Sequence, residues 1–202
     1  MAYPTVSGPY GLKPVKMISG SPYAGVTRQY RIASAYATDI FYGDVVKLVT
    51  GGTVERDVAD AAMTPIGVFL GCSFTDPGTS QPTFKQYWPA STVASDARAF
   101  IVDARDVLFK VAVISSAAST TPIVMSNLAI TDIGANVQMV DNAGSTVTGN
   151  SKIAIDDTSA TTATFPLRVV DIVTDTQTSS TAFPEVLVKW NAGHMFDNTT
   201  GV

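Results

Sequence analysis

Pro65-Ile66-Gly67-Val68-Phe69-Leu70-Gly71-Cys72 is the stretch that decides the fold class of this chain. It is a short apolar run opened by a proline, and this pattern predicts a buried β-strand. Similar short segments recur with turn-forming residues between them: 44–49, 83–88, 99–102, 107–113, 136–140, 152–155, 167–173 and 185–190. Such a series is typical of β-sandwiches and β-barrels, so we predict an all-β fold. The stretch 95–105 also allows a short helix because it is rich in alanine, but we favour a strand there.

The two halves of the sequence share a loose pattern of landmarks. A glycine, a proline and a tryptophan occur in the same order in each half: Gly43, Pro65 and Trp88, then Gly134, Pro166 and Trp190. A duplicated β-unit produces a recurrence of this kind. Chance is the alternative, because β-proteins reuse glycine, proline and valine in many places.

We therefore predict two small β-barrel or β-sandwich units, residues 39–118 and residues 119–202. The Ser/Ala/Thr run 115–121, closed by Pro122, is the best linker candidate between them. Residues 1–38 are different, because they are rich in proline and glycine and because all four of their charged side chains are basic. We predict that they form an extended N-terminal arm. Two roles stay open for it: docking on a neighbouring surface, or folding over its own domain.

Composition excludes several classes of protein. With 46% hydrophobic and 15% charged residues among 202, the chain is too apolar and too weakly charged for a disordered protein. It has no apolar run approaching the ~20 residues of a membrane span, and we expect neither a membrane nor a secretory leader. The formal net charge of −4 argues against nucleic acid as a partner. Cys72, the one cysteine, cannot form an intrachain disulfide and is predicted to be a buried apolar side chain.

Groups suited to catalysis are scarce. One histidine, His194, and one cysteine cannot supply a zinc site, and no nucleophile elbow or phosphate-binding glycine loop is present. The aspartates near Asp103 and Asp157 fit strand ends and turns better than a paired-carboxylate site. We expect no enzyme activity, no catalytic residue, no metal and no cofactor.

Several short motifs resemble those of head decoration (cement) proteins of tailed bacteriophages. They are Gly43-Asp44-Val45-Val46 with the Gly51-Gly52 hairpin that follows, and then Pro65-Ile66-Gly67-Val68-Phe69-Leu70-Gly71. The opening Gly8-Pro9-Tyr10-Gly11-Leu12-Lys13-Pro14-Val15 and the closing segment 193–201 are similar to structural proteins of short-tailed marine and cyanobacterial phages.

The resemblance implies a virion protein on the outer capsid surface, made in the cytoplasm of the bacterial host. It would be a homotrimer that clamps neighbouring subunits of the major capsid protein and stabilises the expanded head. The N-terminal arm is our choice for the strap that faces the capsid. We expect four apolar or aromatic anchors, Tyr3, Tyr10, Leu12 and Tyr23, and four basic residues that meet carboxylates on the shell, Lys13, Lys16, Arg28 and Arg31.

Three other functions remain as alternatives. A small β-sandwich module that binds a receptor or a carbohydrate would expose aromatic side chains on loops, and Tyr87 and Trp88 are the candidates. A tail or head-completion protein would form rings rather than trimers. An aspartate-dependent hydrolase would need Asp103 or Asp157.

Overall fold

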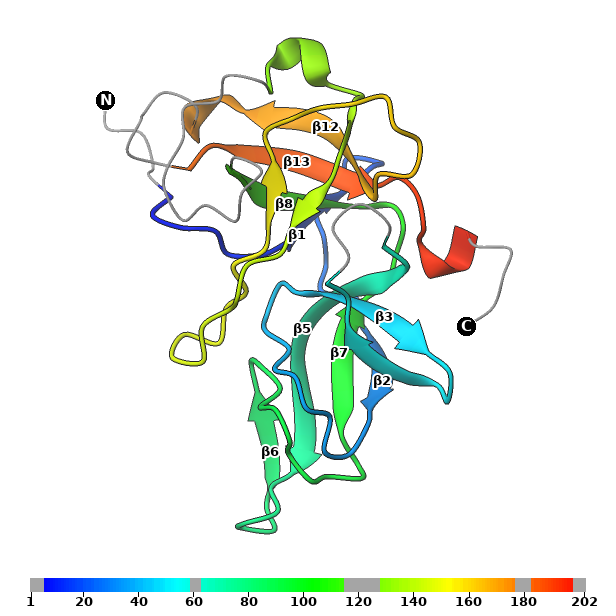
Figure 1. Cartoon of the computed structure of the whole chain (residues 1–202), viewed down its shortest axis with the longest axis vertical. Coiled ribbons are helices and arrows are strands. Elements are labelled where there is room, and N and C mark those ends of the chain that lie inside the picture. The colour runs from blue at the N-terminus through cyan, green and yellow to red at the C-terminus, as the bar shows by residue number, and fades with distance from the viewer. Residues whose placement is uncertain (1–5, 59–62, 115–127, 177–182, 198–202) are drawn as a thin grey trace.

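The computed structural model describes residues 6–58, 63–114, 128–176 and 183–197, and it confirms the all-β prediction. Two lobes lie one above the other in Figure 1, and each lobe is a small barrel-like sheet. The strands are β1 (Lys13–Met17), β2 (Arg28–Ile32), β3 (Val45–Val49), β4 (Thr53–Arg56), β5 (Pro65–Thr75), β6 (Pro82–Lys85), β7 (Arg98–Val102), β8 (Val107–Ile114), β9 (Asn136–Val137), β10 (Met139–Val140), β11 (Ala154–Asp156), β12 (Leu167–Val173) and β13 (Glu185–Trp190). Three short 3-10 helices complete the described secondary structure: η1 (Ile130–Asp132), η2 (Thr174–Thr176) and η3 (Met195–Asp197).

The first barrel, the lower lobe of Figure 1, is a closed ring of five strands. Its order is β3-β4-β2-β7-β5, and β3 pairs with β5 to close the ring. All neighbours are antiparallel except β2 and β4, which are parallel. The additional strand β6 pairs with β5 as a hairpin and lies at the edge of the sheet. A segment predicted as strand or helix, 95–105, contains β7 and is therefore a strand.

The second barrel, the upper lobe, is nearly closed. Its order is β10-β11-β8-β13-β12-β9, and only Gln138 separates β9 from β10 along the chain. Again one pair, β8 and β11, is parallel, and the others are antiparallel. The additional strand here is β1, which pairs antiparallel with the first half of β8.

The two barrels have the same topology. In chain order β2, β3, β4, β5 and β7 correspond to β8, β9 with β10, β11, β12 and β13, and every neighbour relation in one ring recurs in the other. The registers agree as well. Val54 of β4 faces Ile32 and Leu48, and the corresponding Ile155 of β11 faces Val113 and Met139. The structure therefore contains an internal repeat, as the duplicated-unit interpretation requires.

The glycine landmark of the repeat has a structural cause. Gly43 and Gly134 each lie two residues before the corresponding strand, with φ values of 93° and 95° that favour glycine. The amide of Gly43 donates to the carbonyl of Phe69 (2.8 Å), whose own amide donates to the carbonyl of Asp44 (2.9 Å). Gly134, Ala135 and Val169 make the same two hydrogen bonds, at 2.9 and 3.0 Å. This turn ties β3 to β5 in the first barrel and β9 to β12 in the second.

The other two landmarks are less accurate. Phe69 and Val169 occupy matching positions in the two barrels. Pro65 lies four residues before Phe69, whereas Pro166 lies three residues before Val169, so the prolines are out of structural register by one residue. The tryptophans do not correspond, because Trp190 lies in β13 whereas Trp88 precedes β7 and forms an isolated bridge with Ile40. The glycine therefore marks the repeat, the proline marks it to within one residue, and the tryptophan match is coincidental.

The two barrels divide the chain earlier than the predicted boundary between residues 118 and 119. β8 belongs to the second barrel, so the change of barrel falls between Val102 and Val107. Residue patterns cannot show which sheet a strand joins, and β8 is adjacent in sequence to β7. The predicted linker 115–121 lies outside the described residues.

The segment predicted as an extended arm, residues 1–38, contributes a strand to each barrel. β1 pairs with β8, and β2 pairs with β7 and β4. Of the two roles left open by the sequence, the described residues of this segment show folding over their own chain. Pro14 is tolerated in β1 because the strand has a neighbour on one side and a register shift after Pro14.

Polar and apolar contacts join the two barrels. The 143–151 loop of the second barrel reaches the first barrel. There the amide of Tyr42 donates to the carbonyl of Gly149 (3.0 Å), and the amide of Ser151 donates to the carbonyl of Tyr42 (2.9 Å). Arg56 of β4 bridges buried Asp44 (Nε to Oδ2, 3.1 Å) and Asp141 of the second barrel. One buried hydrophobic cluster contains residues of both barrels, including Val45 and Val68 from the first and Phe109 from the second.

Candidate docking surface

Part of the predicted contact set is used inside the chain. Leu12 is 0% exposed, and its amide donates to the carbonyl of Gly43 (3.0 Å). The hydroxyl of Tyr10 donates to buried Glu185, and burial together with this carboxylate raises the pKa of Tyr10 well above its usual range. Lys13 lies 4.2 Å from the centre of the Tyr10 ring. Tyr10 and Leu12 therefore stabilise the fold and are not free anchors, because both side chains already have partners in this chain.

The remaining predicted residues differ in exposure. Lys16 pairs with Leu108 and bridges to Pro22, and the Tyr23 hydroxyl donates to the carbonyl of Val26 (2.6 Å). Arg28 and Arg31 are exposed on β2, and Arg28 pairs with Asp103 (3.1 Å). Tyr3 lies outside the described residues. The structure thus separates the described members of the predicted set into buried or half-buried residues on β1 and beside it, and two exposed arginines on β2.

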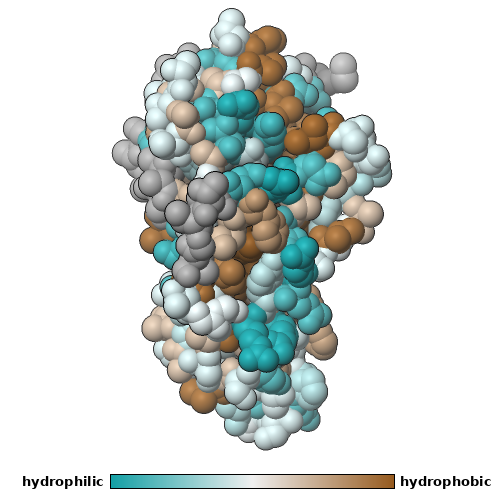
Figure 2. Space-filling view, turned by 90° about the vertical axis from the view of Figure 1, so that its right-hand side faces the viewer, coloured by the Kyte–Doolittle hydropathy of each residue, from teal (hydrophilic) through white to brown (hydrophobic). Residues whose placement is uncertain are grey.

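Exposed apolar and arginine side chains meet where the two lobes join. The waist surface, as we call it, consists of five residues that are each about half or more exposed: Ile18, Val26, Arg28, Arg105 and Phe196. The Arg28 guanidinium lies 5.5 Å from the centre of the Phe196 ring, and Arg105 forms an ion pair with Asp197 of η3. Figure 2 views the right-hand side of Figure 1, where η3 lies, and shows hydrophobic residues among hydrophilic ones at the junction of the two lobes.

A depression of about 410 Å³ adjoins the waist surface. Ile18, Arg105 and Asp197 line it together with Lys189 and Trp190. Trp190 is 5% exposed, and among the described residues its indole N–H has no hydrogen-bond partner. The depression therefore offers two cations, a carboxylate and apolar area to a partner that projects a side chain into it.

His194 lies beneath this region between two aromatic rings. Its ring centre is 5.7 Å from that of Trp190 and 5.6 Å from that of Phe196, and the residue is 1% exposed. Burial, assisted by the nearby Arg105 cation, lowers the pKa of His194 to about 4. The imidazole is neutral at pH 7 and acts as a packing group that supports the Phe196 ring.

Sequence reasoning missed most of the waist surface. Ile18, Val26, Arg105 and Phe196 come from three distant parts of the chain, and no local pattern connects them. The 18–27 loop meets the segment after β7 through the amide of Ile18, which donates to the carbonyl of Asp106 (2.7 Å). Only Phe196 carried a signal, since it lies in the closing segment that resembles phage structural proteins.

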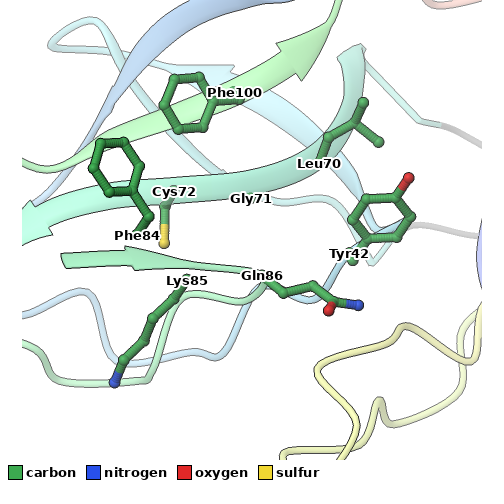
Figure 3. Close-up of a pocket in the computed structure, with 8 residues that line it drawn as sticks. All are labelled: Tyr42, Leu70, Gly71, Cys72, Phe84, Lys85, Gln86 and Phe100. Carbon is green, nitrogen blue, oxygen red and sulfur yellow. The ribbon is translucent and has the colours of Figure 1, made fainter. Parts of the chain in front are cut away.

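A second groove of about 520 Å³ lies on the first barrel between β5 and β6. Phe84 is 76% exposed at its rim, and Figure 3 shows the Phe84 and Phe100 rings on one side of β5 with Lys85 extending away from them. Cys72 is buried beneath, as predicted, and burial raises the pKa of its thiol to about 12. The thiol is therefore protonated at neutral pH and is a poor nucleophile.

The carboxylates considered for catalysis are fixed by structural contacts. Asp103 accepts from the Tyr30 hydroxyl (2.8 Å) and pairs with Arg28. Asp157 is buried after β11, where its amide donates to the carbonyl of Ile114 (2.9 Å), and its neighbour Asp156 accepts from the Gln138 amide (2.7 Å). Within the described residues, no cluster of three His, Cys, Asp or Glu side chains is placed to hold a metal ion.

The carbohydrate-binding alternative loses one of its two aromatic candidates. Trp88 is 0% exposed and packs edge-on against Phe74, with ring centres 5.3 Å apart. Tyr87 is half-buried and stacks on Phe41. The prediction that Trp88 is an exposed loop aromatic is wrong, because the residue fills the interior of the first barrel.

Comparison with protein-family models, curated proteins and solved structures gives no match to this chain. In the described part of the chain, no helix has the length and hydrophobicity needed to cross a membrane.

Proposed function

We propose that the protein decorates the outer surface of a tailed-phage capsid and clamps neighbouring subunits of the major capsid protein. The waist surface is the observation that carries the proposal. Arginine and aromatic side chains are enriched at protein interfaces and dominate their binding energy, and here they are exposed together with two aliphatic side chains. The motif resemblance supplies the identity of the partner.

The location of the waist surface suits a clamp. It draws on the β1–β2 connection, the β7–β8 connection and η3, and so it involves elements of both barrels. Each copy needs only a modest buried area, at roughly 25 cal/mol per Å² of apolar surface, when many copies act on one shell. As a homotrimer, each complex would have three such surfaces and gain from their combined attachment.

The first test measures the protein on particles purified from the source. Mass spectrometry would compare its copy number with that of the most abundant coat protein. We expect a ratio near one to one. A few copies per particle would instead indicate a tail or head-completion role, and absence from particles would overturn the proposal.

A matched pair of variants locates the contact. Phe196→Ala removes the exposed ring of the waist surface, and Phe84→Ala removes an equally apolar exposed ring from the groove on the first barrel. We expect Phe196→Ala to weaken rebinding to stripped particles by about tenfold or more, and Phe84→Ala to leave it unchanged. The reverse result would transfer docking to the β5–β6 groove. Thermal unfolding of both variants would check that each one is folded.

A further inference from the structure

Strand β8 of the second barrel has partners on both sides. Along its first half, Val107, Leu108, Phe109 and Lys110 pair with β1, and residues 109–112 pair with β13 on the other side. The third neighbour, β11, pairs only with Val113 and Ile114 at the end of the strand. β1 therefore covers an edge that the five-stranded ring alone leaves open.

In the part of the chain that the structure describes, no strand covers the corresponding edge of the first barrel. The registers equate Arg28 with Phe109, since they face Ile101 and Val188 at matching positions, and Gln29 with Lys110. β4 pairs only with Arg31 and Ile32, so the first half of β2 has β7 as its one neighbour among the described residues. Continuing the register two residues upstream equates Val26 with Val107.

Burial shows the consequence of the missing neighbour. Val107 is 0% exposed under β1, whereas Val26 is 71% exposed. Ile32 donates its amide to Ala97 on the β7 side, and because directions alternate along a strand, Gln29 and Thr27 direct their backbone groups away from β7. Neither Val26 nor Thr27 makes a backbone–backbone hydrogen bond with any other described residue.

We infer that residues 26–29 form an open strand edge that binds an extended, acidic segment of a partner protein, antiparallel to β2, in the place that β1 occupies on β8. Strand addition of this kind derives affinity from main-chain hydrogen bonds and specificity from the flanking side chains. Val26 and Arg28 belong to the waist surface, so the inference rests on the proposed function for the identity of the partner as a shell subunit. The acidic character of the segment follows from this chain alone.

The charges beside the edge select the occupant. Arg28 and Arg31 lie on opposite faces of β2, so an added strand has an arginine near each of its own faces. Arg28 shares its charge with Asp103 (3.1 Å), and exposed Arg31 supplies the larger part of the positive charge at this edge. In the second barrel the added strand is basic, with Lys13 and Lys16, and Lys13 faces Lys110 of β8, whose own charge is offset by buried Glu185 at 3.1 Å. A basic strand such as β1 of a second copy would oppose the two arginines, whereas glutamate or aspartate side chains would complement them.

Amide hydrogen exchange in the ¹⁵N-labelled full chain tests the edge, with the repeat as internal control. In the free protein we expect the Gln29 amide to exchange far faster than that of Lys110, its counterpart under β1. Two blocked peptides then serve as probes: the sequence of residues 11–18, and the same sequence with Lys13 and Lys16 replaced by glutamate. We expect the glutamate peptide to slow exchange at Thr27 and Gln29 at least tenfold, and the lysine peptide to leave both amides unchanged.

Three results would overturn the inference. Slow exchange at Gln29 in the free protein would mean that the chain already covers the edge. Equal protection by the two peptides, or protection by neither, would remove the charge selection or the strand addition. A change from oligomer to monomer in Arg31→Glu, measured by sedimentation, would make the occupant a second copy instead of an acidic partner.

Variants separate this inference from the proposed function. Arg31→Glu changes an exposed side chain and should reverse the peptide preference, while Thr27→Pro removes an outward amide and should abolish protection at Gln29. Both should weaken binding to stripped particles. If Thr27→Pro and Arg31→Glu bind particles normally, the strand-edge inference fails and the proposed function stands. If the protein is absent from particles while the glutamate peptide still protects the edge, the proposed function fails and the acidic-strand specificity stands.

Discussion

The first and second barrels share one topology but fill it with different side chains. The position of Phe69 in β5 is occupied by Val169 in β12, and the position of Gly67 is occupied by Leu167. Both barrels keep the register of their strand pairs and the glycine turn that precedes β3 in the first barrel and β9 in the second. The backbone hydrogen-bond pattern and that turn therefore specify the topology, and the interior tolerates exchange of volume between positions.

The barrels differ most in how their edges are treated. The first barrel closes completely through β3 and β5 yet leaves the start of β2 without a second neighbour. The second barrel closes less completely but has β1 along β8. Edges are normally covered because an open edge is a template for pairing. An internal repeat in which one copy is covered and the other open thus singles out the open edge as a place for interaction.

The largest expected effect concerns Arg56, which pairs with Asp44 in its own barrel and with Asp141 of the second barrel. Arg56→Met removes the cation beside Asp44, a carboxylate that is 0% exposed. We expect the free energy of unfolding at pH 7 to fall by about 3–5 kcal/mol, because an uncompensated buried charge remains. Urea denaturation followed by tryptophan fluorescence measures it.

Two further variants test the cause of that loss. Asp44→Asn in the Arg56→Met background should recover part of the stability, since it removes the stranded charge. Arg31→Met, which removes an exposed arginine, should change the unfolding free energy by less than about 0.5 kcal/mol. A small effect of Arg56→Met would show that neither the pair with Asp44 nor the pair with Asp141 contributes much to stability.

A matched valine pair compares the two edges directly. Val107→Ala in the second barrel should lower the unfolding free energy by about 2 kcal/mol, because two buried methyl groups are lost beneath β1. Val26→Ala, the same change at the corresponding position of the first barrel, should alter it by less than about 0.5 kcal/mol. Equal losses in urea denaturation would show that Val26 is covered in solution and would contradict the open edge.

The strand content of the fold was accessible from the sequence, because short β-branched runs between turns are local signals. The runs around Val45–Val49 and Val107–Ile114 became β3 and β8. Which sheet each strand joins could not be predicted from the sequence, since this depends on hydrogen bonds between distant segments. For that reason β8 was placed with the wrong unit, and Lys13–Met17, which contains a proline, was not recognised as a strand.

The candidate site was predictable only in part, for a related reason. Arg28 was identified because basic and aromatic residues cluster in residues 1–38. Leu12 and Trp88 carry the same kind of signal, but the fold buries both. Whether an apolar side chain is an anchor or an interior residue depends on which strand covers it, and a single sequence does not record that.

The smallest expected effect is a pH dependence confined to the end of the second barrel. His194, the one histidine of the chain, is buried and has its pKa lowered to about 4, against about 6.5 in an unfolded chain. As the pH falls below 6.5 the unfolded state takes up a proton that the folded state does not, so stability is lost between pH 6.5 and pH 4. From pH 6.5 to 5 we expect a loss of about 1.5 kcal/mol, and His194→Gln should remove it. Asp44, whose pKa is raised by burial, acts with the opposite sign because its folded form binds a proton more readily, but its contribution is the same in both proteins and cancels in their difference. If the variant keeps the full slope in urea denaturation across this range, the imidazole is not neutral in the folded state, and the packing of Phe196 against it must be reinterpreted.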